Sequence, residues 1–556
     1  MWHRSFLHCL SEANHRGLCL YGAGYWGDLA FRLFSLFSIE PVCYCDDDAS
    51  KIGKTFHNIP ILSLKDAAAL YPNAVYIVCI DQTESYGQWG RVQQKKMLSN
   101  LKTYNVYDSN SELRLAFYLF LIDIDGNKGI DNSKKQLSSM NTDEKFYWNN
   151  LKNLVVTNNM SNSGVWFFIQ LLDMHSHILC LPCCKTFENV YENRFQYLEG
   201  DELIIEMAAQ ALGYFKSEFE EMECVGQHKF ENYCLDKEGQ NIKNAYIEPT
   251  DFLSNLYLQF PKNNIKLSSY SQMLKIYFAS YNNCLHRKYD PNINYWMLYD
   301  MHLPNYDIRN EYNYLSANEF NRIEHIILIR EPVQHCFSWV SRTILQSGNN
   351  TAAKKEFISD IIKSELGINI QRKNNFDNLH IIKFEDIKYN GISTLKAFCD
   401  FLQIPFEESM LQTTLNGIEV YFPTRTKDGI KYISGFDTAA VQKKDFSEIL
   451  TPWDEARLNI IYAMFKKSFG YTTNYPSFCD FKLETIEDIL KDDFKFATII
   501  QKMVNEHLEK SEQYDVNNFI RELFTDYIKQ YNRDTVSYYD CICAKETPSL
   551  EEQFIC

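Results

Sequence analysis

The sequence predicts an α/β protein with two parallel-sheet domains followed by helices, and three observations predict it. Near the N-terminus, a short apolar strand, a glycine-rich turn, an apolar helix and a second apolar strand follow one another. A second strand, loop and helix begin near residue 154, and apolar strands recur as far as residue 383. Two amphipathic periods close the chain of 556 residues, which is long enough for several hydrophobic cores.

Composition and charge exclude several classes of protein. The chain is 45% hydrophobic, and 72 acidic against 56 basic residues give a formal charge of −16. That charge repels phosphate backbones, so nucleic acid is not the expected partner. The longest apolar run, 115–122, is too short to cross a bilayer, and residues 1–17 lack the layout of a signal peptide. The 17 cysteines are scattered and are interpreted as free thiols, as in a reducing compartment. We therefore expect a cytoplasmic protein without a transmembrane segment.

The first α/β unit carries a turn of the kind that holds a phosphate. The turn lies between a strand over 18–21 and a helix over 29–37. Its glycines let a ligand approach the helix N-terminus, and an acid about 20 residues later could bind ribose hydroxyls. Alternatively, the turn packs helix on strand without a ligand, and the acid caps a solvated loop. The candidate binding residues are Gly22, Gly24, Gly27 and Asp46.

The pattern of strands divides the chain into four segments. Strands expected at 42–45 and 74–80 continue the first domain, and further strands are expected at 154–157, 295–298, 326–329 and 379–383. A Pro at the first turn marks a helix start at Thr451. The terminal helices could dock on the body, hold a partner or support an oligomer. We expect a nucleotide-binding domain over 1–125, a linker over 126–150, a larger α/β domain over 151–475 and a helical extension over 476–556.

Four segments of the larger domain carry the chemistry. A glycine-containing loop from Ser161 to Trp166 precedes a helix and would present backbone N–H groups to an anion. His302 stands in a His-Leu-Pro string. Arg330 leaves the end of a strand with Ser338 eight residues later, a suitable pair for one phosphate. The last segment comprises the strand end Phe384-Glu385-Asp386 and then Phe401-Leu402-Gln403-Ile404-Pro405.

In this order, the four segments resemble those of the sulfotransferase superfamily, over roughly residues 150 to 475. Its members move a sulfuryl group from 3′-phosphoadenosine 5′-phosphosulfate to a hydroxyl or amine. The resemblance implies a P-loop domain with three α/β/α layers and a parallel sheet. It implies that Arg330 and Ser338 bind the 3′-phosphate, that His302 is the general base and that no metal is needed. It assigns the 5′-phosphosulfate to Ser161, Asn162, Ser163, Gly164, Val165 and Trp166.

The loop departs from the superfamily's pattern in its charge. Asn162 stands where Lys or Arg is usual, and Val165-Trp166 where two threonines are usual. Losing one donor to the transition state can cost about 3–4 kcal/mol. Lys185 and Lys427 are candidate substitutes. The alternative is a catalytically degenerate protein that binds a nucleotide or a glycan without turnover.

The N-terminal domain resembles the Rossmann-like unit found beside sugar-modifying transferases and in sugar acyltransferases. The matching strings are Tyr21-Gly22-Ala23-Gly24, the stretch from Asp46 to Lys54, and Ile59-Pro60. This resemblance implies a dinucleotide or nucleotide-sugar ligand there and a glycan acceptor for the whole chain. A nicotinamide-dependent oxidoreductase ranks last, because no Tyr-x-x-x-Lys pair stands near the turn.

A histidine and cysteine cluster after the larger domain's first helix has the composition of a metal site. His175 ends that helix, and a structural role is the preferred interpretation, so no metal is predicted. The cluster comprises His175, His177, Cys180, Cys183 and Cys184.

Overall fold

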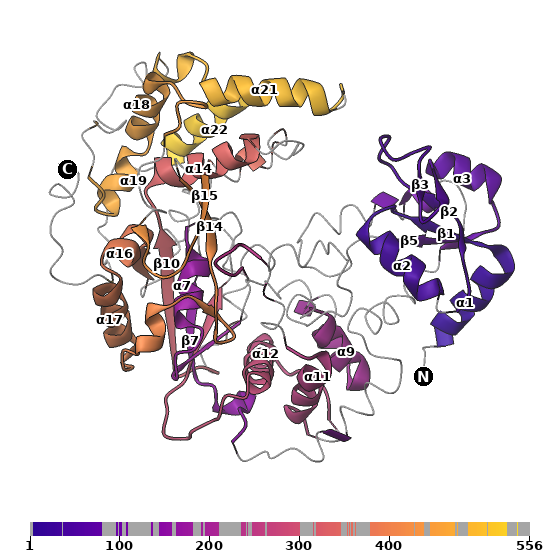
Figure 1. The fold of residues 1–556 in the computed structure, drawn as a ribbon, viewed down its shortest axis with the longest axis horizontal. Coiled ribbons are helices and arrows are strands. Elements are labelled where there is room, and N and C mark those ends of the chain that lie inside the picture. Colours follow the sequence, from indigo (N-terminus) through magenta and orange to yellow (C-terminus); the bar gives the residue numbers. More distant parts are fainter. Residues whose placement is uncertain are drawn as a thin grey trace. The chain divides into compact units, whose positions relative to one another are not determined.

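Figure 1 shows the computed structural model of the chain. The structure describes residues 4–35, 37–79, 96–97, 99–102, 107–108, 135–136, 144–157, 163–181, 191–192, 195–210, 235–240, 242, 247–261, 264–300, 315, 319–345, 353, 355, 357–359, 362, 379–426, 429–438, 445–472, 475, 488–508, 510–530 and 542. Contacts divide the chain into two units. The first comprises 1–151, 185–293 and 415–421, and the second comprises 152–184, 294–414 and 422–556.

The N-terminal sheet has six strands in the order β3-β4-β2-β1-β5-β6, and its pairs are parallel apart from the β3–β4 hairpin. The expected strands at 18–21, 42–45 and 74–80 are confirmed as β1, β2 and β5. β1 and β5 are wholly buried, which is why their residues form continuous apolar runs in the sequence. The elements are α1 (Arg4–Arg16), β1 (Leu18–Tyr21), α2 (Tyr25–Ser35), β2 (Pro41–Cys45), β3 (Thr55–Phe56), β4 (Ile59–Leu62), α3 (Leu64–Leu70), β5 (Val75–Val78) and β6 (Tyr107–Asp108).

Helices predominate among the described residues in the rest of the first unit. Pro249 opens α11 (Pro249–Leu258), and the Ser269 hydroxyl caps α12 (Tyr270–Cys284) by accepting from the Gln272 N–H at 3.0 Å. α12 is buried along its whole length and packs against α11. The remaining elements are the 3₁₀ turns Trp148–Asn150 and Phe195–Tyr197, α9 (Gly200–Gln210) and β13 (Ile418–Glu419).

The second sheet is parallel and has five strands in the order β11-β10-β7-β9-β8. Its four expected strands are confirmed, and the expected helix after the first strand is α7. β7 is central and wholly buried, and it pairs with β10 and β9. The elements are β7 (Asn153–Thr157), α7 (Val165–Leu172), β8 (Ile178–Cys180), β9 (Trp296–Asp300), β10 (Arg322–Ile329), α14 (Pro332–Leu345) and β11 (Leu379–Lys383).

Two hydrophobic cores hold the second unit together. One joins α7 to the helices that follow β11, while the other joins β10 and α14 to the C-terminal helices. Thr451 and Asp454 form a capping box that starts α18 one residue after the predicted cap. The elements beyond β11 are α16 (Phe384–Tyr389), α17 (Gly391–Leu402), the 3₁₀ turn Glu408–Leu411, β12 (Thr414–Leu415), β14 (Phe422–Thr426), β15 (Gly429–Ile433), α18 (Pro452–Ile461), α19 (Ala463–Ser468), α21 (Lys495–His507) and α22 (Val516–Gln530).

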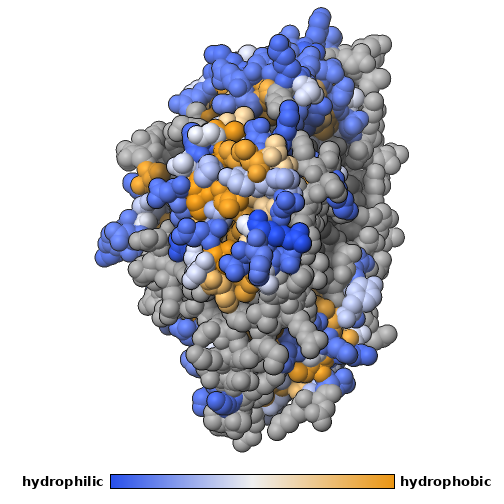
Figure 2. All heavy atoms as spheres, turned by 90° about the vertical axis from the view of Figure 1, so that its right-hand side faces the viewer, coloured by the Kyte–Doolittle hydropathy of each residue, from blue (hydrophilic) through white to orange (hydrophobic). Residues whose placement is uncertain are grey.

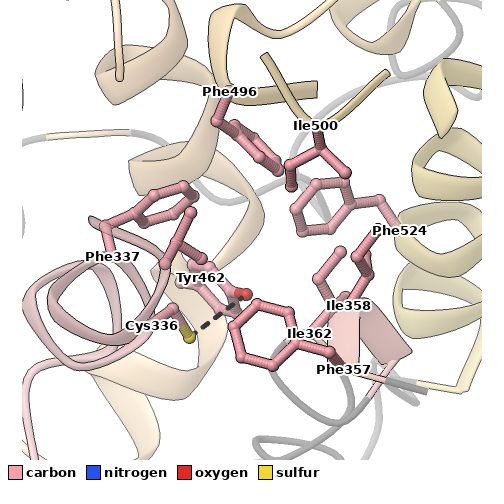
Figure 3. A pocket seen from close by; sticks show the side chains of 10 residues that line it. Cys336, Phe337, Phe357, Ile358, Ile362, Tyr462, Phe496, Ile500 and Phe524 are labelled. Atoms are coloured by element: carbon pink, nitrogen blue, oxygen red, sulfur yellow. Dashed lines mark hydrogen bonds between the residues drawn. The ribbon is translucent and has the colours of Figure 1, made fainter. Parts of the chain in front are cut away.

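A pocket lies in the second of these cores, between α14 and the C-terminal helices (Figure 3). Its empty volume, open mouth included, is about 310 Å³. The polar atoms drawn there are the Cys336 thiol and the Tyr462 hydroxyl, 3.8 Å apart. Aliphatic and aromatic side chains form the rest of the lining, so this pocket is a packing gap in the core.

The outer surface mixes polar and apolar side chains. On the face drawn in Figure 2, apolar side chains form separate patches bordered by hydrophilic ones. Among the helices in the described part of the chain, none combines the length and the hydropathy needed to cross a bilayer.

Candidate functional site

The carboxyl ends of the strands of the second sheet bring the predicted segments to one edge. Thr157 ends β7 and pairs in register with Asp300, the last residue of β9, and its hydroxyl donates to the Asp300 carboxylate at 3.1 Å. Ile329, the last residue of β10, pairs with Lys383, the last residue of β11. In open parallel sheets, ligands bind at this edge. The chain segments that leave β7, β9, β10 and β11 therefore all start from one edge of the sheet.

The loop after β7 ends in a tight approach to an aromatic ring. Gly164 is the N-cap of α7 and has φ +93°, a left-handed conformation that favours glycine. A Cβ at this position would lie 2.1 Å from the Phe384 ring, so only glycine fits. Ser163, directly before it, is fully buried, and its hydroxyl has no hydrogen-bond partner among the described residues. Val165 is buried and Trp166 half-buried in the first turn of α7. The backbone N–H groups of a helix's first turn have no partner within the helix, so this turn can receive an anion.

Arg330 reaches the same aromatic ring from the end of β10. Its guanidinium carbon lies 5.3 Å from the centroid of Phe384, and the residue is 8% exposed. Burial lowers the pKa of Arg330, while the nearby Glu385, Tyr471 and Glu331 oppose that shift. Gly164 and Arg330 therefore both lie close to the ring of Phe384.

The acidic groups beside Arg330 are held by hydrogen bonds. Glu385 accepts from the Glu331 N–H at 2.9 Å and from the Tyr471 hydroxyl at 3.0 Å. Desolvation raises the pKa of Glu385, and Arg330 and these hydrogen bonds counteract the rise. Lys466 pairs with Glu331 at 2.5 Å. These contacts fix the start of α14 and the start of α16 relative to Arg330.

Ser338 lies on α14, eight residues after Arg330. Its hydroxyl donates to the Gln334 carbonyl at 2.5 Å, which uses its proton and leaves its oxygen lone pairs. To donate a hydrogen bond to a phosphate, the Ser338 hydroxyl would first have to break its bond to the Gln334 carbonyl.

Sequence reasoning missed Lys388, which lies on α16. Its ammonium is 3.4 Å from the centroid of Phe167, in the first turn of α7, and 5.7 Å from that of Phe384. It donates to the Gly435 carbonyl at 2.9 Å, and the residue is only 4% exposed. Burial lowers the pKa of Lys388 to about 7. The available signal was a Lys four residues after Phe384, on the same face of a helix.

Several predicted site residues lie outside the described residues. They are Ser161, Asn162 and His302, together with the candidate substitutes Lys185 and Lys427.

The N-terminal glycine turn is shaped by packing at two of its three glycines. A Cβ on Gly22 would lie 2.4 Å from the Cys79 carbonyl oxygen, and one on Gly27 would lie 2.1 Å from the Gly22 carbonyl oxygen. Gly24 differs, because a Cβ there would meet nothing within 4 Å. Close packing of α2 on the end of β1 therefore explains Gly27, and the close approach of the chain after β5 explains Gly22. Gly24 leaves open space beside the first turn of α2.

Asp46 is engaged by the protein itself. Its carboxylate accepts from the Ala23 N–H at 2.8 Å and from the Asp48 N–H at 2.9 Å, and it pairs with Lys51 at 3.1 Å. These bonds tie the glycine turn to the loop after β2. A ribose hydroxyl would have to compete with them, so the structure explains Asp46 as an anchor of the turn.

The histidine cluster after α7 forms hydrogen bonds that join the turn at residues 175–177 to residues 405–407. Nε2 of His175 lies 2.8 Å from the Pro405 carbonyl oxygen, and its Nδ1 accepts from the His177 N–H at 3.1 Å. The Glu407 carboxylate accepts from the Ser176 N–H at 3.0 Å. His175, His177 and Glu407 offer ligand atoms within 4.8 Å of one another, but both ring nitrogens of His175 are engaged by the backbone. Cys180 is buried in β8, and Cys183 and Cys184 lie outside the described residues.

Comparison with known proteins gives structural neighbours alone. No family model matches the chain, and no curated protein matches it. A sulfotransferase domain from the curacin biosynthetic pathway is 16% identical and covers 47% of this chain and 77% of its own, with a TM-score of 0.25. A sulfotransferase domain from the Synechococcus PCC 7002 olefin synthase is 16% identical and covers 49% of this chain and 79% of its own, with a TM-score of 0.24. Sulfotransferase STF9 from Mycobacterium avium is 9% identical and covers 54% of this chain and 71% of its own, with a TM-score of 0.25. At such values, the likeness says nothing about activity or substrate.

Proposed function

We propose that the chain is a sulfotransferase that moves a sulfuryl group from 3′-phosphoadenosine 5′-phosphosulfate to a hydroxyl of a glycan or glycan precursor. The observation that supports it best is the convergence of Gly164 and Arg330 on the ring of Phe384. Two anion-binding positions, a helix N-terminus and a buried guanidinium, then serve one nucleotide with two phosphate-bearing ends.

The chemistry would be an in-line displacement at sulfur. The acceptor oxygen forms a bond to sulfur as the bond from sulfur to the bridging phosphate oxygen breaks, and adenosine 3′,5′-bisphosphate leaves. His302, which follows β9 by two residues in sequence, would take the acceptor proton. The N–H groups before and within the first turn of α7 would hold the 5′-phosphosulfate, and Arg330 the 3′-phosphate.

A second candidate is a protein of the same fold that binds the nucleotide without turnover. Asn162, which stands where the superfamily has a cation, favours it. The two proposals share the nucleotide site and differ only in the transfer step. The glycan acceptor and a nucleotide sugar or dinucleotide ligand for the N-terminal sheet rest on the resemblance of that part of the sequence alone.

Calorimetric titration with adenosine 3′,5′-bisphosphate tests the site. We expect the full chain to bind with micromolar affinity. Arg330→Ala should lose about 1.5–3 kcal/mol or more of binding free energy, because a charge-assisted phosphate contact disappears. Arg322→Ala is the matched control, since Arg322 lies at the opposite end of β10, paired with Glu324 and the Phe401 carbonyl. It should bind the nucleotide like wild type.

Transfer of labelled sulfuryl from the donor to glycan acceptors then separates the two candidates. Label in the acceptor that depends on His302 supports the transferase, while binding without transfer across neutral and charged glycans supports the binding protein. Absence of nucleotide binding by the wild-type chain would contradict both.

A further inference from the structure

Lys388 is a buried cation without a direct anionic partner in the described part of the chain. Its contacts there are the Gly435 carbonyl, the face of Phe167 and, more distantly, Phe384. Asp437 favours its protonated form from a distance, and Arg330 opposes it. Burying an ammonium is costly unless a partner compensates it. Among the described residues, no anion is in direct contact with this ammonium, so an anion bound nearby would stabilise it.

The neighbouring groups are arranged to receive such a charge. Lys388 lies against the first turn of α7, through Phe167, and this eight-residue helix has no acid in its first turn. The fully buried Ser163 hydroxyl before this turn has no partner among the residues that the structure describes. An anion at the N-terminus of α7 would meet the helix dipole, this hydroxyl and the field of Lys388.

We propose that Lys388 supplies the positive charge that the β7–α7 loop lacks at Asn162, and so stabilises the phosphosulfate group bound at the N-terminus of α7. The inference deepens the proposed function and rests on it. The Lys388 ammonium lies over the Phe167 ring, 3.4 Å from its centroid, and its proposed role is electrostatic and positioning. The guanidinium of Arg330 and the ammonium of Lys388 then both lie beside the Phe384 ring, one for each phosphate-bearing end of the nucleotide.

Protonation gives this role a signature that a purely structural lysine lacks. With a pKa of about 7, Lys388 is roughly half protonated at neutral pH in the free protein. A bound anion favours the ammonium, so Lys388 should take up part of a proton when the nucleotide binds near pH 7. Above the free pKa, the affinity must fall as pH rises, by up to about tenfold per unit.

The test is calorimetric titration of the full chain with adenosine 3′,5′-bisphosphate, in two buffers of different ionisation enthalpy. Lys388→Met removes the charge and keeps the length, while Lys388→Arg restores the charge. Lys396→Met is the control, because the Lys396 ammonium also lies over an aromatic ring, that of Phe406, 5.4 Å from its centroid, and Lys396 is exposed on α17. Thermal unfolding of each variant checks that it is folded.

We expect nucleotide binding to be about tenfold weaker or more in Lys388→Met, with the proton uptake gone. Lys388→Arg and Lys396→Met should bind with near-normal affinity. If wild type binds the nucleotide and Lys388→Met binds it with the same affinity and the same proton uptake, the inference is overturned and the proposed function stands. No binding by wild type would overturn both. If Lys388→Met fails to fold, wild-type affinity that stays constant from pH 7.5 to about 9 overturns the inference.

Discussion

Gly164 carries both the backbone geometry and the packing of the candidate site. Its φ of +93° disfavours any side chain, and a Cβ would overlap the ring of Phe384. We expect Gly164→Ala to lower the free energy of unfolding by about 2–4 kcal/mol and to weaken binding of adenosine 3′,5′-bisphosphate, because Phe384 must move. Urea denaturation and calorimetry measure the two effects.

Gly24→Ala is the matched substitution for that experiment. Gly24 has open space around its Cα and no left-handed φ, so its replacement should change stability by at most about 0.5 kcal/mol. If Gly24→Ala lowered the free energy of unfolding as much as Gly164→Ala, the packing argument would be contradicted.

Single residues mark where sequence reasoning reached its limit. The sequence placed Gly164 before a helix and Arg330 at a strand end, because both follow from local patterns. It could not show that Asp46 is engaged by Ala23 and Lys51, since that depends on the path of the loop after β2. Lys388 was missed for the same reason: its burial depends on rings contributed by α7 and by its own helix.

At the scale of elements, the turn between α7 and β8 depends on His175. We expect His175→Ala to lower the free energy of unfolding by about 2–3 kcal/mol, because it removes a buried ring that links the Pro405 carbonyl and the His177 N–H. His177→Ala, at a partly exposed ring, should cost less than about 1 kcal/mol. Chemical denaturation compares them.

The same variants test the metal interpretation. Zn²⁺ at about 100 μM should leave the thermal midpoint of wild type unchanged, since a ligand that binds only the native state would raise it. A Zn²⁺-dependent rise that disappears in both His175→Ala and His177→Ala would show a metal site instead.

Elements differed in how well the sequence predicted them. Seven strands of the two sheets were predicted, and four of them, β1, β5, β7 and β9, are buried on both faces and form apolar runs. The short strands β3, β4, β6 and β8 were not predicted. α1 was not predicted, because it is mostly polar and its described buried side chains are only Cys9, Leu10 and Ala13. Of the two amphipathic periods that close the chain, the one over 519–527 is confirmed as α22. α21 was missed, although Phe496, Ile500 and Val504 recur at helical spacing.

At the scale of the whole molecule, the C-terminal helices belong to the core of the second unit. Ile500 on α21 is 1% exposed and packs in the same cluster as β10 and α14. We expect Ile500→Ala to lower the free energy of unfolding by about 2–4 kcal/mol, because the helix unfolds together with that core. Lys502→Ala, exposed on the same helix, should change it by at most about 0.5 kcal/mol.

Thermal or urea unfolding, followed by tryptophan fluorescence and circular dichroism, measures both variants. A normal stability in Ile500→Ala would mean that α21 is a detached extension. The buried Arg457 strengthens the expectation, since it joins α18 to the start of α21 through the Asp492 carbonyl at 2.6 Å and the ring of Phe494 at 3.8 Å.

That shared core also sets an order of events during synthesis. Strands of the N-terminal sheet pair with neighbours close in sequence, so this sheet can form while the chain is still being made. The core that contains Ile327 of β10 also needs Phe524 of α22, which comes much later in the sequence. Residues of β10 and α14 therefore leave the ribosome with an apolar face that stays uncovered until α22 has been synthesised. Chaperone dependence and the slow, non-local phase of folding should both be concentrated in that interval.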